Sequence, residues 1–506
     1  MKLTRMLTSV GICLCLQAAN GQNEGMGPGM GPGGPGGMAP GMAAGAVPIF
    51  PPDLEALEQF PQSERDRIVT GIESFDTVLD GWERKSRTGN IMSPYQNEVI
   101  AEFEPGEPKF EPQPGKTYFY ENTGVMANMF SVGRNVTTAQ SNRVVVGDAE
   151  TKEVIAYGEL APELRTSVHT TVVSPDGRYV YIIGALSAET QPTLLSTTAM
   201  VKVDAMTLEP VKIVTMGGRL HHGQIFRDNL LLIDTFARAD DGLDVFLYDT
   251  ETDEIVGGVR DEDLGGSSYT SYTDGEYIYI LMQPAGYGPR GMDAFVGASS
   301  MNIGRLTTMR PFWVARVNPD TWEVEQEYPY PGYRGDWIVI DSASEYMYVP
   351  AGGSSSVTKI DIDSGEIAWH AAAGIGPYGA TLNADESEVW VADKGETTGF
   401  MGRTVTVLDT ASGRGVETVF AGYMIDHVLL APNGREVWGT SNAEGVLYVF
   451  DTATREQMAT IEMPGYGDAH GLVWVNYDEN GDGRVVRDQG GFHGGLDPAE
   501  GIFLDY

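Results

Sequence analysis

The stretch APNGREVWGTSN, residues 431–442, is closely followed by LYVFDTATREQMATI, residues 447–461. The earlier stretch has a polar turn that leads into a strand, and the later stretch has a pair of strands on either side of a turn that begins with Asp451. An Asp side chain in such a turn can accept a hydrogen bond from the backbone two residues on, which fixes a tight hairpin. Together the stretches predict one small antiparallel sheet.

The same pattern recurs along the chain, for example in SPDGRYVYIIG (174–184) and NADESEVWVADKG (383–395). The residues that open the successive hairpin turns are Asp204, Asp249, Asn318, Asp361, Asp409 and Asp451, with spacings of 45, 69, 43, 48 and 42 residues. We interpret the single long interval as an insertion near residues 283–312. A period in the forties with four strands per unit is typical of β-propeller blades.

Counting the two halves of the repeat gives the number of blades. There are seven first halves, the last of them in DAHGLVWVNYD (468–478), but only six second halves follow residue 200. The missing half is RVVVGDAETKEVIAYGEL (143–160), and pairing it with the last blade would remove an open sheet edge. The sequence thus predicts an all-β, seven-bladed β-propeller over 142–506, closed by N-terminal strands. Eight blades remain an alternative if TYFYE (117–121) belongs to a further sheet.

Three segments precede the predicted propeller. Residues 1–21 have the basic start, short apolar core and small-residue end of a signal peptide. Residues 22–47 are so rich in Gly, Pro and Met that we expect a disordered linker. Residues 48–141 are expected to form a helical and irregular extension, with short amphipathic helices over 53–85.

Charge and cysteine content narrow the classes of partner. The formal net charge of −38 argues against nucleic acid and anionic membranes as partners. Because residues 1–21 have the features of a signal peptide and no apolar run is long enough to span a membrane, we expect a periplasmic or secreted protein. Both cysteines, Cys13 and Cys15, lie in the signal peptide, and the mature chain therefore has no disulfide or thiolate metal site.

The placement of the seven histidines is the main functional signal. His169, His222, His427 and His470 fall at the start of the innermost strand of four neighbouring blades, where the strand faces the central channel. Imidazoles that converge from different strands are typical of a transition-metal site. His221 and His493 are weaker candidates for an additional ligand, and His370 ends an outer strand. A lone histidine at a strand start is usually satisfied by a backbone carbonyl instead.

The segments TSVHTTVVSPDGRYVYIIG, VDAMTLEPVKIV and LHHGQIF resemble the propeller domain of nitrous oxide reductase, and the repeat in general resembles YVTN-type propellers. The former family holds a copper–sulfide cluster on seven axial histidines. The resemblance implies ligands at His169, His222, His427 and His470, whereas Val168, Trp337 and Gly379 occupy the other three positions. This chain also lacks the family's cupredoxin domain for electron entry. A smaller site, with copper or another divalent transition metal, is what the resemblance implies.

A second metal-like motif is DENGDG (478–483). The side chains of Asp478, Asn480 and Asp482 alternate before Gly483, as in loops that bind calcium, and Asp488 could replace the missing acidic ligand. Acidic turns of this kind are also common without a metal.

Two classes of function follow. The first is an exported metal-binding propeller, and if it is an enzyme, an oxidoreductase that acts on a small-molecule substrate at an axial, histidine-bound metal. The second is a non-catalytic YVTN-like propeller that binds a protein partner at the cell surface or in the periplasm. The fold alone does not choose between them.

Overall fold

The computed structural model describes residues 96–124, 142–160, 168–183, 199–238, 242–284, 312–332, 334–395, 398 and 401–506. The expected signal peptide, the linker and the helices over 53–85 lie outside these residues, as does nearly all of the insertion near 283–312. Within the described ranges, no helix is long and apolar enough to cross a membrane.

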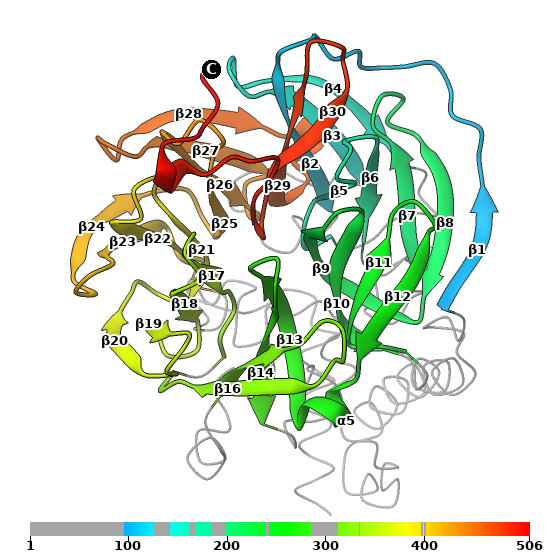
Figure 1. Ribbon diagram of the computed structural model, residues 1–506. Helices are drawn as coiled ribbons and strands as arrows, with labels where there is room; N and C mark the ends of the chain where they lie inside the picture. The colour runs from blue at the N-terminus through cyan, green and yellow to red at the C-terminus, as the bar shows by residue number, and fades with distance from the viewer. Residues whose placement is uncertain are drawn as a thin grey trace, which may run out of the picture.

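Seven sheets stand around a central axis, as Figure 1 shows, and this confirms the predicted seven-bladed propeller. We number the blades along the chain, starting from the sheet that follows His169. Blade 1 comprises β5 (Val172–Val173), β6 (Tyr179–Ile182), β7 (Ala199–Asp204) and β8 (Pro210–Met216), with β1 (Gln96–Glu102) added at the edge of β8. Blade 2 comprises β9 (Gly218–Arg227), β10 (Leu230–Arg238), β11 (Val245–Asp249) and β12 (Glu254–Val259).

The next four blades are built in the same way. Blade 3 comprises β13 (Gly266–Thr273), β14 (Ile278–Pro284), β15 (Trp313–Val317) and β16 (Val324–Pro329), after the short helix α5 (Asp261–Leu264). Blade 4 comprises β17 (Val339–Ile340), β18 (Tyr346–Ala351), β19 (Ser356–Asp361) and β20 (Ile367–Ala372). Blade 5 comprises β21 (Pro377–Leu382), β22 (Glu388–Asp393), β23 (Thr404–Asp409) and β24 (Gly415–Phe420). Blade 6 comprises β25 (Ile425–Leu430), β26 (Glu436–Ser441), β27 (Val446–Asp451) and β28 (Gln457–Glu462).

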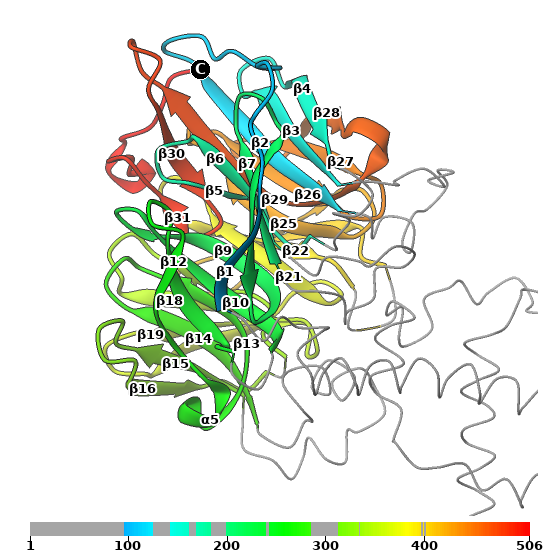
Figure 2. The ribbon, with the colours of Figure 1, turned by 90° about the vertical axis from the view of Figure 1, so that its right-hand side faces the viewer.

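Blade 7 joins the two ends of the propeller. Its strands are β29 (Asp468–Tyr477), β2 (Thr117–Gly124), β3 (Arg143–Asp148) and β4 (Glu153–Glu159), and β30 (Gly483–Asp488) and β31 (Gly491–Phe492) pair beyond β29. Two 3-10 turns, Pro464–Tyr466 and Pro498–Glu500, lie on either side of this C-terminal group. In Figure 2, where the ring is seen from the side, β31 lies on the left-hand face.

The closing blade confirms one expectation and corrects two others. Residues 143–160 form the two outer strands of the blade that begins at Asp468, as expected. However, Thr117–Gly124 does not start an eighth blade, because it pairs with β29 on one side and β3 on the other. It is also not part of an irregular extension, since all eight of its residues are buried in the sheet. The propeller therefore begins before residue 142.

The same turn recurs in every blade, led by an Asp or, in blade 3, by Asn318. Asp451, for example, accepts hydrogen bonds from the backbone N–H groups of Ala453 (3.0 Å) and Thr454 (2.7 Å). Four residues after the leading residue, the backbone has a positive φ in each blade, at Lys152, Leu208, Asp253, Trp322, Gly365, Gly413 and Arg455. Asp148 leads the corresponding turn of blade 7, which makes the count of seven blades independent of the sheet assignment.

Large aromatic side chains fill the spaces between blades. Trp438 of blade 6 packs between Phe119 and Trp474 of blade 7, with ring centres 5.2 and 5.6 Å away. All three side chains are fully buried. Burial of such aromatic residues is a major source of folding free energy, and it fixes each blade against its neighbour. The inner strands are therefore held rigidly around the axis.

Candidate axial site

Histidine rings from four blades meet at the axis. His222 lies on β9, His427 on β25 and His470 on β29, while His169 precedes β5. With His221 the rings form a closed circuit, in which neighbouring ring centres are 4.1 to 5.8 Å apart. Inner strands run in the same direction through the ring of blades, and this is why residues at their N-terminal ends share one end of the channel.

His222 and His427 are neutral donors of a lone pair. Both side chains are buried. Burial lowers the pKa of His427 to about 3, and burial together with the neighbouring His221 lowers the pKa of His222 well below its usual range. Nδ1 of His222 contacts the Thr270 hydroxyl at 2.7 Å, but its Nε2 has no hydrogen-bond partner. Neither ring nitrogen of His427 has one.

His470 is in a different electrostatic state. Its Nε2 lies 2.5 Å from Oδ2 of Asp426, and its Nδ1 lies 3.3 Å from Oδ1 of Asp468. Burial alone would lower the pKa of His470, but the two carboxylates raise it to about 10. The two carboxylates thus favour the protonated ring, and the side-chain amide of Asn442 also contacts Nε2. An imidazolium has no lone pair to offer to a metal.

Asp234 organises the segment around His221 and His222. Its Oδ1 accepts from the backbone N–H of His222 at 3.0 Å and lies 3.1 Å from Nδ1 of His221. Its Oδ2 accepts from the backbone N–H and the hydroxyl of Ser271 and from the hydroxyl of Thr270. His221, His222 and Asp234 offer ligand atoms that lie within 4.8 Å of one another. A carboxylate that holds a histidine nitrogen is a common way to orient a metal-binding imidazole.

Aromatic side chains close the other side of the circuit. The indole of Trp337 lies 4.5 Å from the ring of His427 and 5.8 Å from that of His222, centre to centre. Tyr378 stacks on His427 at 6.0 Å, and its hydroxyl lies 3.3 Å from that of Tyr269. Trp337 thus stands at an inner-strand position without a histidine, as the sequence indicates.

The remaining sequence candidates lie elsewhere. His493 is away from the histidine circuit, with its Nε2 2.9 Å from Oδ1 of Asp488. Asp478 accepts hydrogen bonds from the backbone of Asn480 and Asp482 in the turn between β29 and β30. Asp488 is not brought to that turn, because the extended strand β30 carries it to the opposite end of the hairpin. There it accepts from the backbone N–H of Ile225 at 2.7 Å.

The charged residues around the histidines were not singled out from the sequence. Asp426 directly precedes His427, and Asp468 stands two residues before His470. Lys394 lies 2.8 Å from Oδ1 of Asp426, and Glu121 accepts from the backbone N–H of His470 at 2.5 Å. The short motifs IDH (425–427) and DAH (468–470) were the available signal for the two aspartates. Glu121 reaches the site through β2, whose pairing only the structure reveals.

Comparison with known proteins shows no family for this chain. No family model matches the chain, and no curated protein matches it. Similar solved structures include a putative 6-phosphogluconolactonase from Bacteroides fragilis, with a TM-score of 0.49, 13% identity and coverage of 72% of this chain and 100% of that one. The dihydro-heme d1 dehydrogenase NirN has a TM-score of 0.46 and 14% identity, over 74% of this chain and 79% of that one. The hydrazine synthase of Kuenenia stuttgartiensis has a TM-score of 0.46 and 17% identity, over 62% of this chain and 90% of that one.

Proposed function

We propose that this protein is an exported β-propeller that binds a transition-metal ion on its axis, with His222 and His427 as ligands. One observation carries the proposal: two buried, neutral imidazoles from different blades meet at the axis with ring nitrogens that have no hydrogen-bond partner. Leaving such groups unsatisfied in a protein interior costs free energy, and a bound cation would offset that cost.

The spacing of the rings suits a shared ion. If the nitrogens of two imidazoles lie about 2 Å from one tetrahedral ion, their ring centres are about 5 Å apart. The ring centres of His222 and His427 are 5.4 Å apart. His221, oriented by Asp234, supplies a third ligand in this proposal, and His169, whose ring centre lies 5.0 Å from that of His221, supplies a fourth. Nitrogen ligands of this kind suit copper and zinc, and the resemblance described above makes copper the first metal to test.

His470 has a different role in the proposal. Its proton is held between Asp426 and Asp468, and the imidazolium therefore positions charge beside His427 and His169 instead of binding the ion. The negative field of the chain, at −38 overall, favours entry of cations into the site. If the bound metal is copper, it can cycle between oxidation states, and this would give the protein an oxidoreductase activity on a small substrate.

Metal analysis of the variants tests the proposal. Protein purified from its native compartment should contain copper or zinc in a stoichiometric amount, and His222→Ala with His427→Ala should remove it without unfolding the chain. His370→Ala is the matched control, because His370 is on the outer strand β20 and its Nδ1 contacts Thr358. Equal metal content in the double variant and the parent would refute the axial site.

The non-catalytic alternative has its own supporting observation. Apolar side chains are exposed on the outermost strands of the blades, including Phe420 on β24 at 63% and Met458 on β28 at 53%. Such positions suit a protein partner that docks against the rim of the ring. If the purified protein holds no transition metal and takes none up, this becomes the better interpretation.

A further inference from the structure

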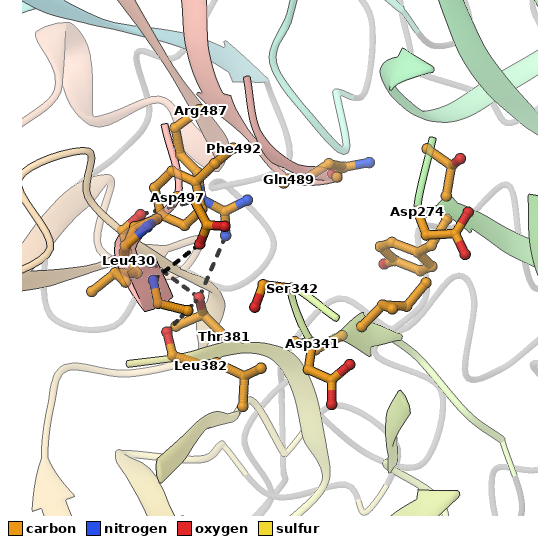
Figure 3. A pocket seen from close by; sticks show the side chains of 18 of the residues that line it. Asp274, Asp341, Ser342, Thr381, Leu382, Leu430, Arg487, Gln489, Phe492 and Asp497 are labelled. Carbon is orange, nitrogen blue, oxygen red and sulfur yellow. Dashed lines mark hydrogen bonds between the residues drawn. The ribbon is translucent and has the colours of Figure 1, made fainter. Parts of the chain in front are cut away.

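A second polar site lies at the opposite end of the channel from the histidines. A cavity of about 310 Å³ is lined by the C-terminal ends of inner strands and by the chain after β30, and Figure 3 shows a portion of its wall. Trp337 borders this cavity and also contacts His222 and His427, so its indole separates the two sites. The volume is at the lower end of that found for small-molecule sites.

Arg487 is a buried cation in the wall of the cavity. Only 6% of the residue is exposed, and burial lowers the pKa of its guanidinium to about 10. Its nitrogens donate to the carbonyls of Leu430 (3.2 Å) and Asp488 (2.6 Å) and, at 3.4 Å, to the hydroxyl of Thr381. These acceptors are all neutral, and among the described residues no carboxylate lies within 4 Å of the guanidinium.

The charge of Asp488, the carboxylate nearest in sequence, raises the pKa of Arg487 against the effect of burial, but the oxygens of Asp488 bind other groups. Asp488 instead accepts from the backbone of Ile225 and Gly490 and pairs with His493. Buried charges in proteins are usually paired, and a guanidinium has five N–H groups, more than these contacts use. The arrangement points to an anionic group that completes the site from within the cavity.

Gln489 provides an independent pointer to a ligand. Its Oε1 accepts from the hydroxyl of Thr170 at 2.8 Å, which fixes the orientation of the amide. The Nε2 group is buried and has no hydrogen-bond partner, although the residue is only 5% exposed. In Figure 3 this nitrogen projects into the space between the Arg487 side and the Asp274 side of the cavity. An unsatisfied buried donor calls for an acceptor atom at that point.

The outer region of the same cavity is acidic. Asp274, Asp341, Glu386 and Asp497 line it, and among the described lining residues the basic ones are Arg487 and His493, of which His493 is already paired with Asp488. Burial, followed by the charges of Asp341 and Asp497, raises the pKa of Glu386. Carboxylates that share a region without a cation favour a positively charged group between them.

We propose that this cavity binds a small zwitterion of the amino-acid class, with its carboxylate on Arg487 and Gln489 and its ammonium group toward the acidic outer region. A simple anion would have to enter against the negative field of the chain, whereas a zwitterion carries no net charge. Oxygens of a carboxylate can accept from the planar guanidinium and from an amide N–H at the same time. The site is separate from the proposed metal site and does not depend on it.

Calorimetric titration with matched probes tests the proposal on the full propeller. The probes are glycine, β-alanine, γ-aminobutyrate and 5-aminopentanoate, which differ in the distance between the two charges. Butyrate and butylamine match γ-aminobutyrate but carry one charge only. We expect saturable binding of at least one zwitterion, and at least tenfold weaker binding of both single-charge probes. No binding of any zwitterion, or equal binding of either single-charge probe, would overturn the proposal.

Two variants assign the binding to the named residues. Gln489→Glu keeps the size but replaces the unsatisfied donor with a carboxylate, and it should weaken zwitterion binding at least tenfold. Oε1 of Glu386 accepts from the backbone N–H of Ser342 at 2.7 Å, and Glu386→Gln keeps an oxygen for this bond. The substitution removes one negative charge from the acidic outer region of the cavity and should therefore weaken zwitterion binding. Glu153→Gln, on the exposed strand β4, is the control. Unchanged affinity in both cavity variants would refute the assignment, while His222→Ala with His427→Ala should leave zwitterion binding intact.

Discussion

Nε2 of His470 lies 2.5 Å from Oδ2 of Asp426, and both side chains are buried next to the axis. Asp468 contacts the other ring nitrogen at 3.3 Å, and Lys394 lies 2.8 Å from the second oxygen of Asp426. Positive and negative groups thus alternate along this network. Its members depend on one another, because each buried charge is tolerated only while its partner is present.

His470→Gln should therefore destabilise the protein strongly. The substitution leaves Asp426 with Lys394 and the Asn442 amide, and it leaves Asp468 without its cation. Breaking a buried pair of this kind costs about 3–5 kcal/mol. The measurement is the free energy of unfolding in urea of metal-free protein. Adding Asp468→Asn should recover some of the loss, because it removes the carboxylate that the first change left unpaired. A loss below about 1 kcal/mol would show that His470 is not an imidazolium at neutral pH.

A second prediction concerns pH. Burial raises the pKa of Asp393 to about 6, although the hydroxyls of Thr404 and Thr406 donate to its Oδ2. Its folded pKa thus exceeds the ordinary value of 3.8. The contribution of this group to stability is fully present below about pH 4, and it is lost as the pH rises through about 6.

Asp393→Asn tests this assignment, since the amide oxygen can still accept from the two threonines and the side chain never ionises. Relative to the parent, the variant should be more stable at pH 7.5 than at pH 4 by about 3 kcal/mol, at roughly 1.4 kcal/mol for each pKa unit. Urea unfolding of both proteins at the two pH values measures the difference. Parallel stability profiles would contradict the raised pKa of Asp393.

A third prediction concerns the closure of the ring. Phe119 on β2 is fully buried against Trp438, and its ring also fills the space over Gly147. Phe119→Ala should cost about 3–5 kcal/mol in unfolding free energy, as is usual for a buried Phe. Val99→Ala on β1 is the control, because Val99 is 43% exposed and should change stability little. If the two variants lose the same free energy, β2 does not contribute to the closing blade.

These predictions depend on features that the sequence revealed to different degrees. The blades could be predicted because each carries its own local signal, such as the Asx turn at Asp451 and its equivalents. The pairing of residues 143–160 with the last blade could be predicted because seven first halves needed a seventh partner. Thr117–Gly124 has no turn motif of the repeat, and its place between β29 and β3 depends on long-range pairing that no local pattern encodes.

The axial site could be predicted in position but not in charge. Periodicity placed His169, His222, His427 and His470 at equivalent inner positions, and the structure brings their rings to the axis. Periodicity could not distinguish the protonated ring of His470 from the neutral ring of His427, because that difference arises from where the carboxylates of Asp426 and Asp468 point. The residue type alone carries no such information.

The last prediction uses the indole that separates the two sites. Trp337 is 1% exposed, lies against His222 and His427, and borders the cavity of Figure 3. Trp337→Leu removes the planar ring but keeps an apolar side chain, so it should open a path from the cavity to the histidines.

We expect diethylpyrocarbonate to modify His222 and His427 at least tenfold faster in metal-free variant protein than in the metal-free parent, as measured by mass spectrometry of peptides. His370, on the outer strand β20, should react at the same rate in both proteins and reports any general unfolding. Equal protection of His222 and His427 in the variant would mean that other side chains, and not Trp337, close the axial site from this end.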